Sequence, residues 1–361
     1  MISLVLVSYR SAPLAERAAA TFREDARAAG EPAEVVAVVN SGDPDEACLL
    51  AATCDRVVDP GTNLGYAGGL NAGIAAARGD LLVLSNPDVA FLPGSVGALA
   101  AAARRGVDVI AGPAFFWDDA ATLLLPPMEM PSPVEVLRRV LSRDETRGGR
   151  AFRRAARRAL VLEGAVRRGE EVAADSLSGA VMVATRSTVG RLGPLDERYR
   201  LYYEENDWQR RLLARGGRLV AAGGARVVHR YAQSSRREPR ADGWFRESER
   251  LYFETHFGAA GRRVLDRTAE RTAVSPPLPA PASALEWAGR SVLVAVSPVP
   301  WFRPFILARP AAGASSFVLP AEIAGAHAGT PWFARAFDAA TFATLSEARL
   351  LDAPPVPGPP R

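Results

Sequence analysis

The first 115 residues alternate between continuous apolar runs and segments with helical spacing of their apolar positions. The apolar runs, which predict strands buried on both faces, are Ile2–Ser8, Val35–Val39, Val57–Val58, Leu81–Leu84 and Val107–Ala111. The segments with helical spacing are Leu14–Ala29, Asn71–Ala77 and Ser95–Arg105. Strands of this kind, separated by helices, predict an α/β fold with a mostly parallel, Rossmann-like sheet and flanking helices. Ligands of such sheets bind beyond the carboxyl ends of the strands.

The second half of the chain continues this pattern and then changes. Ser178–Ala184 predicts a strand, the acid-rich segment before Gly216 and Gly217 predicts a helix, and Arg218–Val228 predicts another strand. Of the 28 prolines, 15 lie in residues 276–361. Four short strands are expected among them, at Ser291–Val296, Phe302–Ala308, Ser316–Leu319 and Trp332–Phe337.

These changes in pattern predict three parts of the chain. Residues 1–274 form the α/β domain, within which residues 132–175 are an Arg-rich helical insert. Residues 275–285 are a Pro-rich linker, because a run of closely spaced prolines is stiff and cannot continue regular structure. Residues 286–361 form a small β-rich accessory region.

Composition narrows the class of protein. The 361 residues are 48% hydrophobic and 23% charged, which excludes a disordered tail, a collagen and a disulfide scaffold. All 44 basic residues are Arg, so chemistry that needs a lysine, such as a Walker A loop or a pyridoxal Schiff base, is excluded. Cys48 and Cys54 are too few for a four-ligand zinc site and favour a reduced, cytosolic setting. The chain begins with a strand-like run rather than a signal peptide, and no apolar stretch long enough to span a membrane follows.

Positive charge is concentrated in residues 132–172, which carry eleven Arg and six acidic residues, whereas the whole chain has a net charge of +4. Phe152, Ala156 and Leu160 recur there at helical spacing among arginines. One interpretation is a helix that docks on the anionic inner face of the cell membrane and receives a lipid-linked acceptor. The alternative is a solvated helix that covers a core. Few aromatic residues are interleaved with the arginines, so no nucleic-acid partner is expected.

Polar residues follow four of the predicted strands, in Ser8–Arg10, Asn40–Asp43, Asn63–Gly73 and Ser85–Val89. Each group alone is typical of a turn. Four such groups at one edge of a sheet favour a ligand site. The glycine cluster within Asn63–Gly73 would let the backbone approach a phosphate, although the chain has no G-x-G-x-x-G dinucleotide motif.

Two residues are candidate ligands of a divalent metal, Mg²⁺ or Mn²⁺. Asp88 follows a strand and an Asn-Pro turn, where a metal would bridge its carboxylate to a diphosphate. The alternative is an Asx turn or the N-cap of the helix near Ser95. His229 ends the predicted strand Arg218–Val228 and is either a packed or capping residue or a ligand beside Asp88.

Five carboxylates lie between residues 196 and 207, and Glu204, Glu205 and Asp207 open a predicted helix. Acids in a first helical turn interact favourably with the helix dipole, which is a structural explanation for them. The aromatic pair Tyr202 and Tyr203 directly before the glutamates instead predicts a partly desolvated pocket. Desolvation raises the pKa of a carboxyl group toward the range of a general base.

Taken together, these motifs resemble those of family 2 glycosyltransferases of the GT-A fold, in particular the bacterial rhamnosyltransferase-like group that acts in cell-wall and polysaccharide biosynthesis. The segments that carry the resemblance, in the order of the family, are Leu4–Tyr9, Asn63–Gly73, Gly79–Val89, Ser178–Met182, Leu195–Glu197, Tyr202–Trp208 and Ala225–His229. They span about residues 1–255.

The resemblance implies inverting transfer of a sugar, rhamnose or a related hexose, from a nucleoside diphosphate sugar to a hydroxyl of a glycan or lipid-linked acceptor. It implies donor-binding roles for Ser8, Tyr9, Asn40, Asn63, Gly65, Gly68, Gly69, Asn71 and Asn86. It implies metal binding by Asp88, and acceptor contacts by Gly179, Tyr202 and Trp208. Glu205 would be the catalytic base, with Glu204 and Asp207 orienting acceptor and base, and each of the three remains a candidate for the base itself.

Two alternatives to this function remain at the level of sequence. Asn40 and Glu205 stand where the family usually has Asp, which would also suit a catalytically silent carbohydrate-binding or scaffold protein of the same fold. A sugar nucleotidyltransferase uses a similar sheet and metal. It normally needs a Gly-rich signature with Arg or Lys after the first strand, and Ser8–Ser11 does not provide one.

Overall fold

The computed structural model describes residues 1–141, 145–229, 240–269, 278–289, 291–298, 305–320, 323 and 331–350, with the side chains of 139–151 excepted. Two compact units form within the chain. Unit 1 comprises residues 1–115, 127–136 and 161–268, and unit 2 comprises residues 116–126, 137–160 and 269–361. Residues 116–126 and 137–160 therefore group with the C-terminal strands, whereas the sequence placed them within 1–274.

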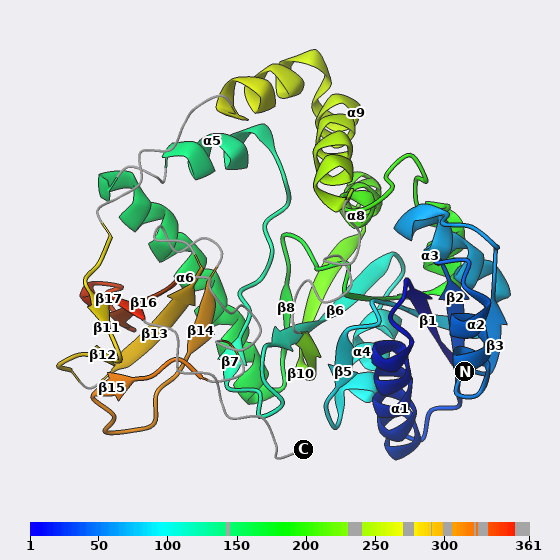
Figure 1. Ribbon diagram of the computed structural model, residues 1–361, viewed down its shortest axis with the longest axis horizontal. Helices are drawn as coiled ribbons and strands as arrows, with labels where there is room; N and C mark the ends of the chain where they lie inside the picture. Colours follow the sequence, from blue (N-terminus) through cyan, green and yellow to red (C-terminus); the bar gives the residue numbers. More distant parts are fainter. Residues whose placement is uncertain are drawn as a thin grey trace. The chain divides into compact units, whose positions relative to one another are not determined.

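The sheet of unit 1 is parallel at its centre. Its four parallel strands are, in spatial order, β3 (Arg56–Val58), β2 (Ala33–Val39), β1 (Ile2–Ser8) and β4 (Leu81–Ser85). β9 (Val181–Thr185) pairs antiparallel with β4, and β6 (Val109–Phe116) pairs antiparallel with β9. Figure 1 shows β1, β2 and β3 next to one another. All residues of β1 and β4 are buried, as continuous apolar runs require. The predicted α/β class with a mostly parallel sheet is confirmed.

Helices cover the parallel strands. These are α1 (Ala12–Ala28), α2 (Pro44–Ala51), α3 (Gly65–Ala76) and α4 (Ser95–Arg104). α3 begins six residues before the predicted Asn71, because glycines of low helix propensity hide its first turns. A Cβ atom at Gly69 would lie 2.8 Å from a methyl carbon of Val7, so the absent side chain lets α3 lie directly on β1.

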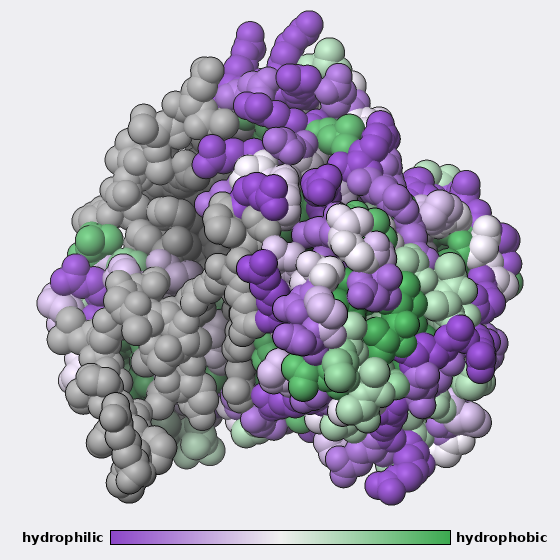
Figure 2. Space-filling view, turned by 45° about the vertical axis from the view of Figure 1, so that its right-hand side comes forward, coloured by the Kyte–Doolittle hydropathy of each residue, from purple (hydrophilic) through white to green (hydrophobic). Residues whose placement is uncertain are grey.

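The later part of unit 1 contains the predicted order of strand, helix and strand, together with elements that the sequence did not predict. β10 (Arg218–His229) pairs antiparallel with β5 (Val89–Phe91) and β8 (Glu171–Ala173). The helices are α7 (Arg186–Leu192), α8 (Glu204–Ala214) and α9 (Ala241–Ala269), the last with a kink at Gly258. The sequence predicted α8 and β10 but not α9. On the side of unit 1 seen in Figure 2, hydrophilic residues surround a smaller apolar area, as expected for a surface in contact with water.

Unit 2 contains the predicted C-terminal strands. Its sheet has the order β11 (Pro281–Ala282), β17 (Thr344–Leu350), β16 (Trp332–Asp338), β13 (Val292–Ser297), β14 (Ile306–Ala308) and β7 (Leu123–Leu124). β12 (Leu285–Glu286) pairs with β15 (Ser316–Phe317). The β-rich accessory region is thus confirmed. The sequence missed β7, β11, β12 and β17. Residues 275–277, 290, 299–304, 321–322, 324–330 and 351–361 of its predicted segments lie outside the described residues.

The Arg-rich insert contains α5 (Pro133–Leu141) and α6 (Glu145–Arg168). In the part of α6 that belongs to unit 2, the ring of Phe152 lies 5.6 Å from that of Phe305 and 5.2 Å from that of Phe337. This part of α6 therefore covers the core of unit 2 with its apolar side. Among the residues that the structure describes, we find no helix with the length and apolarity needed to cross a bilayer. Cys48 and Cys54 are both free thiols.

Candidate active site

A cavity of about 290 Å³ lies in unit 1, beyond the carboxyl ends of β1, β2 and β4. Its size is near the lower end of the range for small-molecule sites. The structure brings eleven of the sequence-predicted site residues together in its lining, namely Tyr9, Asn40, Asn63, Gly65, Asn86, Asp88, Gly179, Tyr202, Glu204, Glu205 and His229. The other six do not line it, namely Ser8, Gly68, Gly69, Asn71, Asp207 and Trp208.

Ser8 belongs to a buried network around Glu46 that the sequence did not indicate. One carboxylate oxygen of Glu46 accepts hydrogen bonds from the Ser8 hydroxyl at 2.6 Å and the Ser11 backbone N–H at 2.7 Å. The other oxygen accepts from the Arg10 N–H at 2.9 Å and the Ser41 hydroxyl at 2.5 Å. Burial alone would raise the pKa of Glu46, but these hydrogen bonds outweigh it and lower the pKa. Glu46 thereby fixes the loops after β1 and β2.

Asn40 and Asn63 shape the start of α3. The Asn40 side chain accepts the Leu64 N–H at 2.9 Å and donates to the carbonyl oxygen of Gly65 at 3.0 Å. The Asn63 side chain accepts the Gly65 N–H at 2.8 Å. Gly65 has φ +78°, and a Cβ atom there would lie 2.9 Å from the carbonyl oxygen of Arg200. The two asparagines therefore hold a turn that only glycine fits, directly at the cavity wall.

The remaining predicted residues outside the lining have packing roles. The Asn71 amide donates to the carbonyl oxygen of Leu195 at 2.9 Å and accepts the Leu195 N–H at 3.0 Å, which ties α3 to the loop before α8. Trp208 is fully buried, and its indole N–H donates to the carbonyl oxygen of Gly193. A Cβ atom at Gly68 would lie 2.9 Å from that of Leu64.

Asp88 and His229 face each other in the cavity wall. The Asp88 Oδ1 lies 3.5 Å from the His229 Nε2, and both side chains are almost completely buried. Among the described residues, Asp88 Oδ1 is a buried oxygen without a hydrogen-bond partner. The N-cap of α4 is Gly94, so the alternative that Asp88 caps this helix is wrong. A buried, unsatisfied carboxylate oxygen beside an imidazole nitrogen fits a divalent cation, for which oxygen and nitrogen are suitable ligands.

A strained turn places Glu204 and Glu205 at the first positions of α8. The preceding residues Tyr202 and Tyr203 have φ values of +67° and +71°, a conformation that costs residues other than glycine about 1–3 kcal/mol each. α9 holds this turn. The Tyr203 hydroxyl donates to Glu249 at 2.8 Å, and the Ser248 hydroxyl donates to the carbonyl oxygen of Leu201 at 3.0 Å.

The two glutamates are the most strongly perturbed acids of the site. Burial, followed by repulsion from Glu205, raises the pKa of Glu204 well above its usual range. Burial also raises the pKa of Glu205, to about 7. Within the described part of the chain, one oxygen of each carboxyl group is buried without a hydrogen-bond partner. The desolvated pocket expected from the aromatic pair is thus confirmed, with one group suited to proton transfer near neutral pH.

Gly179 lies directly against Glu205. A Cβ atom at Gly179 would lie 3.1 Å from both Cβ and Cγ of Glu205. The segment before Gly179 is fixed by Gln209 of α8, whose side-chain amide accepts the Leu177 N–H at 2.7 Å and donates to the Leu177 carbonyl oxygen at 2.8 Å. The small residue at 179 therefore leaves the space that the Glu205 side chain occupies.

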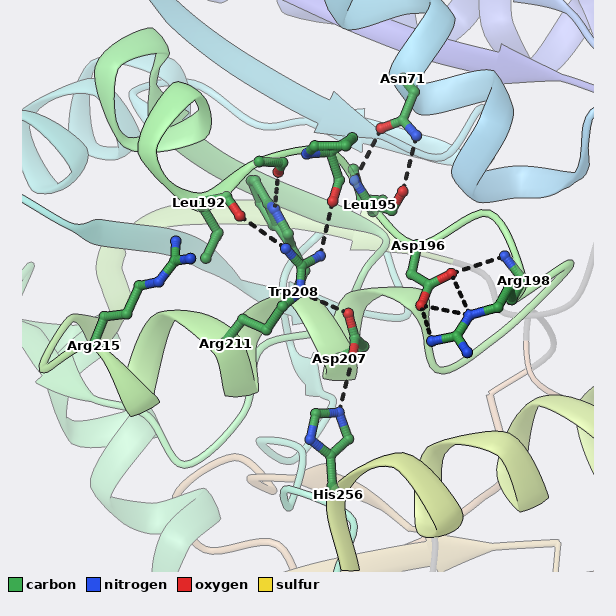
Figure 3. Close-up of polar contacts among 12 residues, drawn as sticks. Asn71, Leu192, Leu195, Asp196, Arg198, Asp207, Trp208, Arg211, Arg215 and His256 are labelled. Atoms are coloured by element: carbon green, nitrogen blue, oxygen red, sulfur yellow. Dashed lines mark hydrogen bonds and ion pairs between the residues drawn. The ribbon is translucent and has the colours of Figure 1, made fainter.

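Asp207 points to a second polar cluster on α8 rather than into the cavity lining (Figure 3). Its carboxylate accepts from Arg211 Nε at 2.9 Å and contacts His256 Nε2 at 2.9 Å. Arg211 also donates to the carbonyl oxygens of Leu192 and Pro194. Asp207 thus joins α8 to α9 and to the loop before the strained turn.

Nine further residues line the cavity that were not selected as site residues, among them Tyr66, Met128, Arg200 and Trp244. Burial, together with the charges of Glu204, Glu205 and Asp88, raises the pKa of Tyr66 well above its usual range. Its position within the glycine cluster of Asn63–Gly73 is a sequence signal that could have selected Tyr66. Met128, Arg200 and Trp244 come from loops and from the unpredicted α9, for which the sequence has no comparable signal.

Comparison with known proteins finds a matching family and several similar proteins. Residues 3–161 match the model of the family described as "Glycosyl transferase family 2". Residues 3–161 are therefore similar to family 2 glycosyltransferases, and the chain resembles the rhamnosyltransferase-like group of that family.

Two curated relatives, from the Mycobacterium tuberculosis strains CDC 1551 / Oshkosh and ATCC 25618 / H37Rv, are named N-acetylglucosaminyl-diphospho-decaprenol L-rhamnosyltransferase. Each is 29% identical to this chain over 256 residues, which cover 66% of this chain and 79% of the relative.

Two solved structures are also similar. One is GalNAc-T7 with UDP, GalNAc and Mn²⁺, with 11% identity, a TM-score of 0.46, and coverage of 98% of this chain and 72% of that chain. The other is the mannosyltransferase PcManGT from Pyrobaculum calidifontis in complex with GDP-Man and Mn²⁺. It has 15% identity, a TM-score of 0.43, and coverage of 75% of this chain and 76% of that chain.

Proposed function

We propose that the protein is an inverting glycosyltransferase that moves rhamnose or a related hexose from a nucleoside diphosphate sugar to a hydroxyl group of a glycan or lipid-linked acceptor. One observation carries the proposal. Asp88 and the pair Glu204 and Glu205 come from segments more than a hundred residues apart, and together with His229 they line one cavity. A site for a leaving diphosphate and a site for a base are both needed for a single displacement at the anomeric carbon.

The donor would lie against the carboxyl edge of the parallel strands. Tyr9, Asn40, Asn63, Gly65 and Asn86 line this part of the cavity and would contact the nucleotide and diphosphate. Asp88 and His229 would hold a divalent cation, Mg²⁺ or Mn²⁺. The cation supplies neutralisation of the charge that develops on the leaving diphosphate. Two protein ligands suffice because such cations commonly complete their coordination with phosphate oxygens and water.

Glu205 would be the general base. With a pKa of about 7, it is partly ionised at neutral pH and accepts the proton of the acceptor hydroxyl as the oxygen attacks the anomeric carbon. The bond between the sugar and the diphosphate breaks on the opposite face, and the single displacement inverts the configuration. Glu204, whose pKa is also raised by burial, lies next to Glu205 and would orient the acceptor and the base. Asp207 would act as a positioning residue through Arg211 and His256.

The acceptor side includes Gly179 and Tyr202 of the cavity lining. The curated relatives are named for an acceptor linked to decaprenol through a diphosphate, which favours a lipid-linked acceptor here. We expect a cytoplasmic protein that contacts the inner face of the membrane through residues 132–172. Because α6 covers the core of unit 2 around Phe152, this contact would use arginines rather than the apolar side. A liposome flotation assay without salt-sensitive binding would contradict the membrane contact.

The test is a donor screen with the purified protein and Mn²⁺, followed by NMR of the product. We expect one nucleotide sugar to support transfer, with the opposite anomeric configuration in the product. Asp88→Ala should lower the transfer rate at least about a hundredfold, since charge stabilisation of a leaving group contributes several kcal/mol. Retention of configuration, or full activity of Asp88→Ala, would contradict the mechanism.

A further inference from the structure

The mouth of the cavity carries an aromatic side chain with two guanidinium groups against it. Arg200 Cζ lies 5.5 Å from the ring centre of Trp244, and Arg240 Cζ lies 5.0 Å from the same centre. Both distances are in the range of cation–π contacts. Arg200 is exposed and Trp244 is half-buried, whereas Asp88 and Glu204 of the same cavity are buried. Arg200 and Trp244 therefore mark the outer end of the cavity, and Arg240 lies outside its lining, against Trp244.

The charge of this outer end is opposite to that of the inner end. Asp88, Glu204 and Glu205 line the inner part, and Arg200 is the cation of the lining. Within the residues that the structure describes, Arg200 forms no ion pair with a carboxylate; its guanidinium contact is with Trp244. An arginine without an acidic partner adds little to the stability of the fold, so its place at the cavity is better explained by a ligand.

The backbone holds Arg200 in this place. The Tyr66 N–H donates to the carbonyl oxygen of Arg200 at 2.8 Å, and the left-handed Gly65 lies against the Arg200 Cα. Trp244 restricts the guanidinium further, because a cation stacked on an aromatic face loses less freedom when it binds. The position is therefore fixed at both the backbone and the side chain.

We propose that Arg200 and Arg240, held on Trp244, bind the diphosphate of a lipid-linked acceptor; this subsite rests on the proposed function. Guanidinium groups bind phosphate oxygens through paired, charge-assisted hydrogen bonds. The diphosphate of the donor has a different place, at the buried Asp88 and His229. A diphosphate at the exposed Arg200 would then belong to the acceptor, which is the second substrate. The acceptor would enter through the mouth of the cavity, and its lipid chain would stay outside.

The experiment compares two acceptors in the full-length protein. One is an N-acetylglucosaminyl diphosphate ester with a short alkyl chain, and the other is the matching alkyl glycoside without the diphosphate. Arg200→Gln should raise KM about tenfold for the diphosphate acceptor, since a charged hydrogen bond contributes enough for such a change. The KM for the alkyl glycoside and the KM for the donor should stay unchanged.

Arg198→Gln is the matched control. Arg198 is also exposed, lies two residues away and pairs with Asp196 outside the cavity lining. It should leave all three KM values unchanged. Arg240→Gln is the second variant and should raise only the KM for the diphosphate acceptor, by a smaller factor. Thermal unfolding of each variant checks that it folds.

The outcomes separate this subsite from the proposed function. An active wild type whose KM values are unchanged by both substitutions overturns the subsite alone. An increase in the donor KM, or an equal increase for both acceptors, also overturns it, because the cations would then serve another group. A wild type that transfers sugar to neither acceptor, from any nucleotide sugar, overturns the proposed function and the subsite with it.

Discussion

Two sets of buried glutamates lie near the same edge of the sheet and have opposite environments. Glu46 accepts hydrogen bonds from two hydroxyl groups and two backbone N–H groups, and its pKa is lowered. Glu204 and Glu205 each keep a buried oxygen without a partner among the described residues, and their pKa values are raised. The two sets therefore differ in whether their carboxyl oxygens have hydrogen-bond partners, rather than in whether they are buried.

This difference separates structural acids from acids available for chemistry. A carboxylate with all its hydrogen bonds made inside the protein stabilises the loops that donate them. A buried carboxyl group that lacks a hydrogen-bond partner lowers the stability of the fold. Such a group is retained where a substrate or a cation supplies the missing partner. Asp88 belongs to the second set, because its Oδ1 is also unsatisfied in the part of the chain that the structure describes.

The largest expected effect is that of removing the base. Glu205→Gln keeps the size of the side chain but cannot accept a proton, so kcat/KM should fall about a thousandfold, within the usual range for a general base. Steady-state transfer rates measure this loss. Glu254→Gln is the control, because Glu254 is exposed and pairs with Arg262 on α9. Wild-type activity in Glu205→Gln would place the base elsewhere.

The second effect is on stability. In Glu46→Gln, an amide NH₂ would face hydroxyl and N–H donors, so we expect the free energy of unfolding to fall by about 3 kcal/mol. Denaturant titration measures it. The exposed Glu24 of α1 provides the control Glu24→Gln, for which a change within about 0.5 kcal/mol is expected. A Glu46→Gln variant as stable as the wild type would show that the network contributes nothing.

A third effect tests the space around the base. Gly179→Ala places a methyl group against the Glu205 side chain and should lower kcat about thirtyfold, because small displacements of a catalytic group are costly. Gly190→Ala on α7 has no atom within 4 Å of the added Cβ and serves as the control. The two substitutions add the same atom, so equal rates would exclude steric control of Glu205.

The smallest effect is the dependence on pH, and it has opposite signs for the two sets. A base with a pKa of about 7 should give about a tenfold rise in kcat/KM between pH 6 and pH 8. Since the folded-state pKa values of Glu204 and Glu205 are raised, their contribution to stability is lost as the pH rises from about 4.5 through 7. The lowered pKa of Glu46 has the reverse consequence, a loss as the pH falls below about 4.5.

The two opposite dependences of stability on pH can be measured separately. Unfolding of the wild type at pH 5 and pH 8 should show the loss with rising pH, and Glu204→Gln with Glu205→Gln should remove most of it. Glu46→Gln should instead flatten the loss on acidification. Identical pH profiles of stability in all variants would contradict the distinction between the two sets.

The sequence predicted those parts of the fold that depend on local pattern. β1 has the predicted bounds, Ile2–Ser8, because every residue of a strand buried on both faces is constrained to be small or apolar. α3 was predicted too short, because its glycines serve contact with β1 rather than helix propensity. β17 escaped prediction because Thr344–Leu350 is not a continuous apolar run, and the adjacent polar residues Ser346 and Glu347 interrupt a strict alternation.

For the site, the sequence identified the residues that follow strands but not those that act through distant contacts. Glu46 resembles a surface acid in an Ala-rich helix, and only the fold brings Ser8 and Ser41 to it. Trp244 likewise lies on α9, whose contacts with the turn at Tyr202 and Tyr203 involve no motif. Long-range partners of this kind are set by tertiary packing, which a single sequence does not encode in its spacing.

The turn at Tyr202 and Tyr203 also has a consequence for the order in which the protein folds during its synthesis on the ribosome. The ring of Phe245 lies 5.5 Å from each of the two tyrosine rings, and Tyr252 packs on Tyr203 at 5.2 Å. A nascent chain that ends before residue 241 already contains every strand of the parallel sheet, yet it lacks the helix that holds the two tyrosines in their left-handed conformation. The glutamates would therefore reach their working positions only after the residues of α9 as far as Tyr252 have been added, and a chain truncated before that point would fold in part without becoming an enzyme.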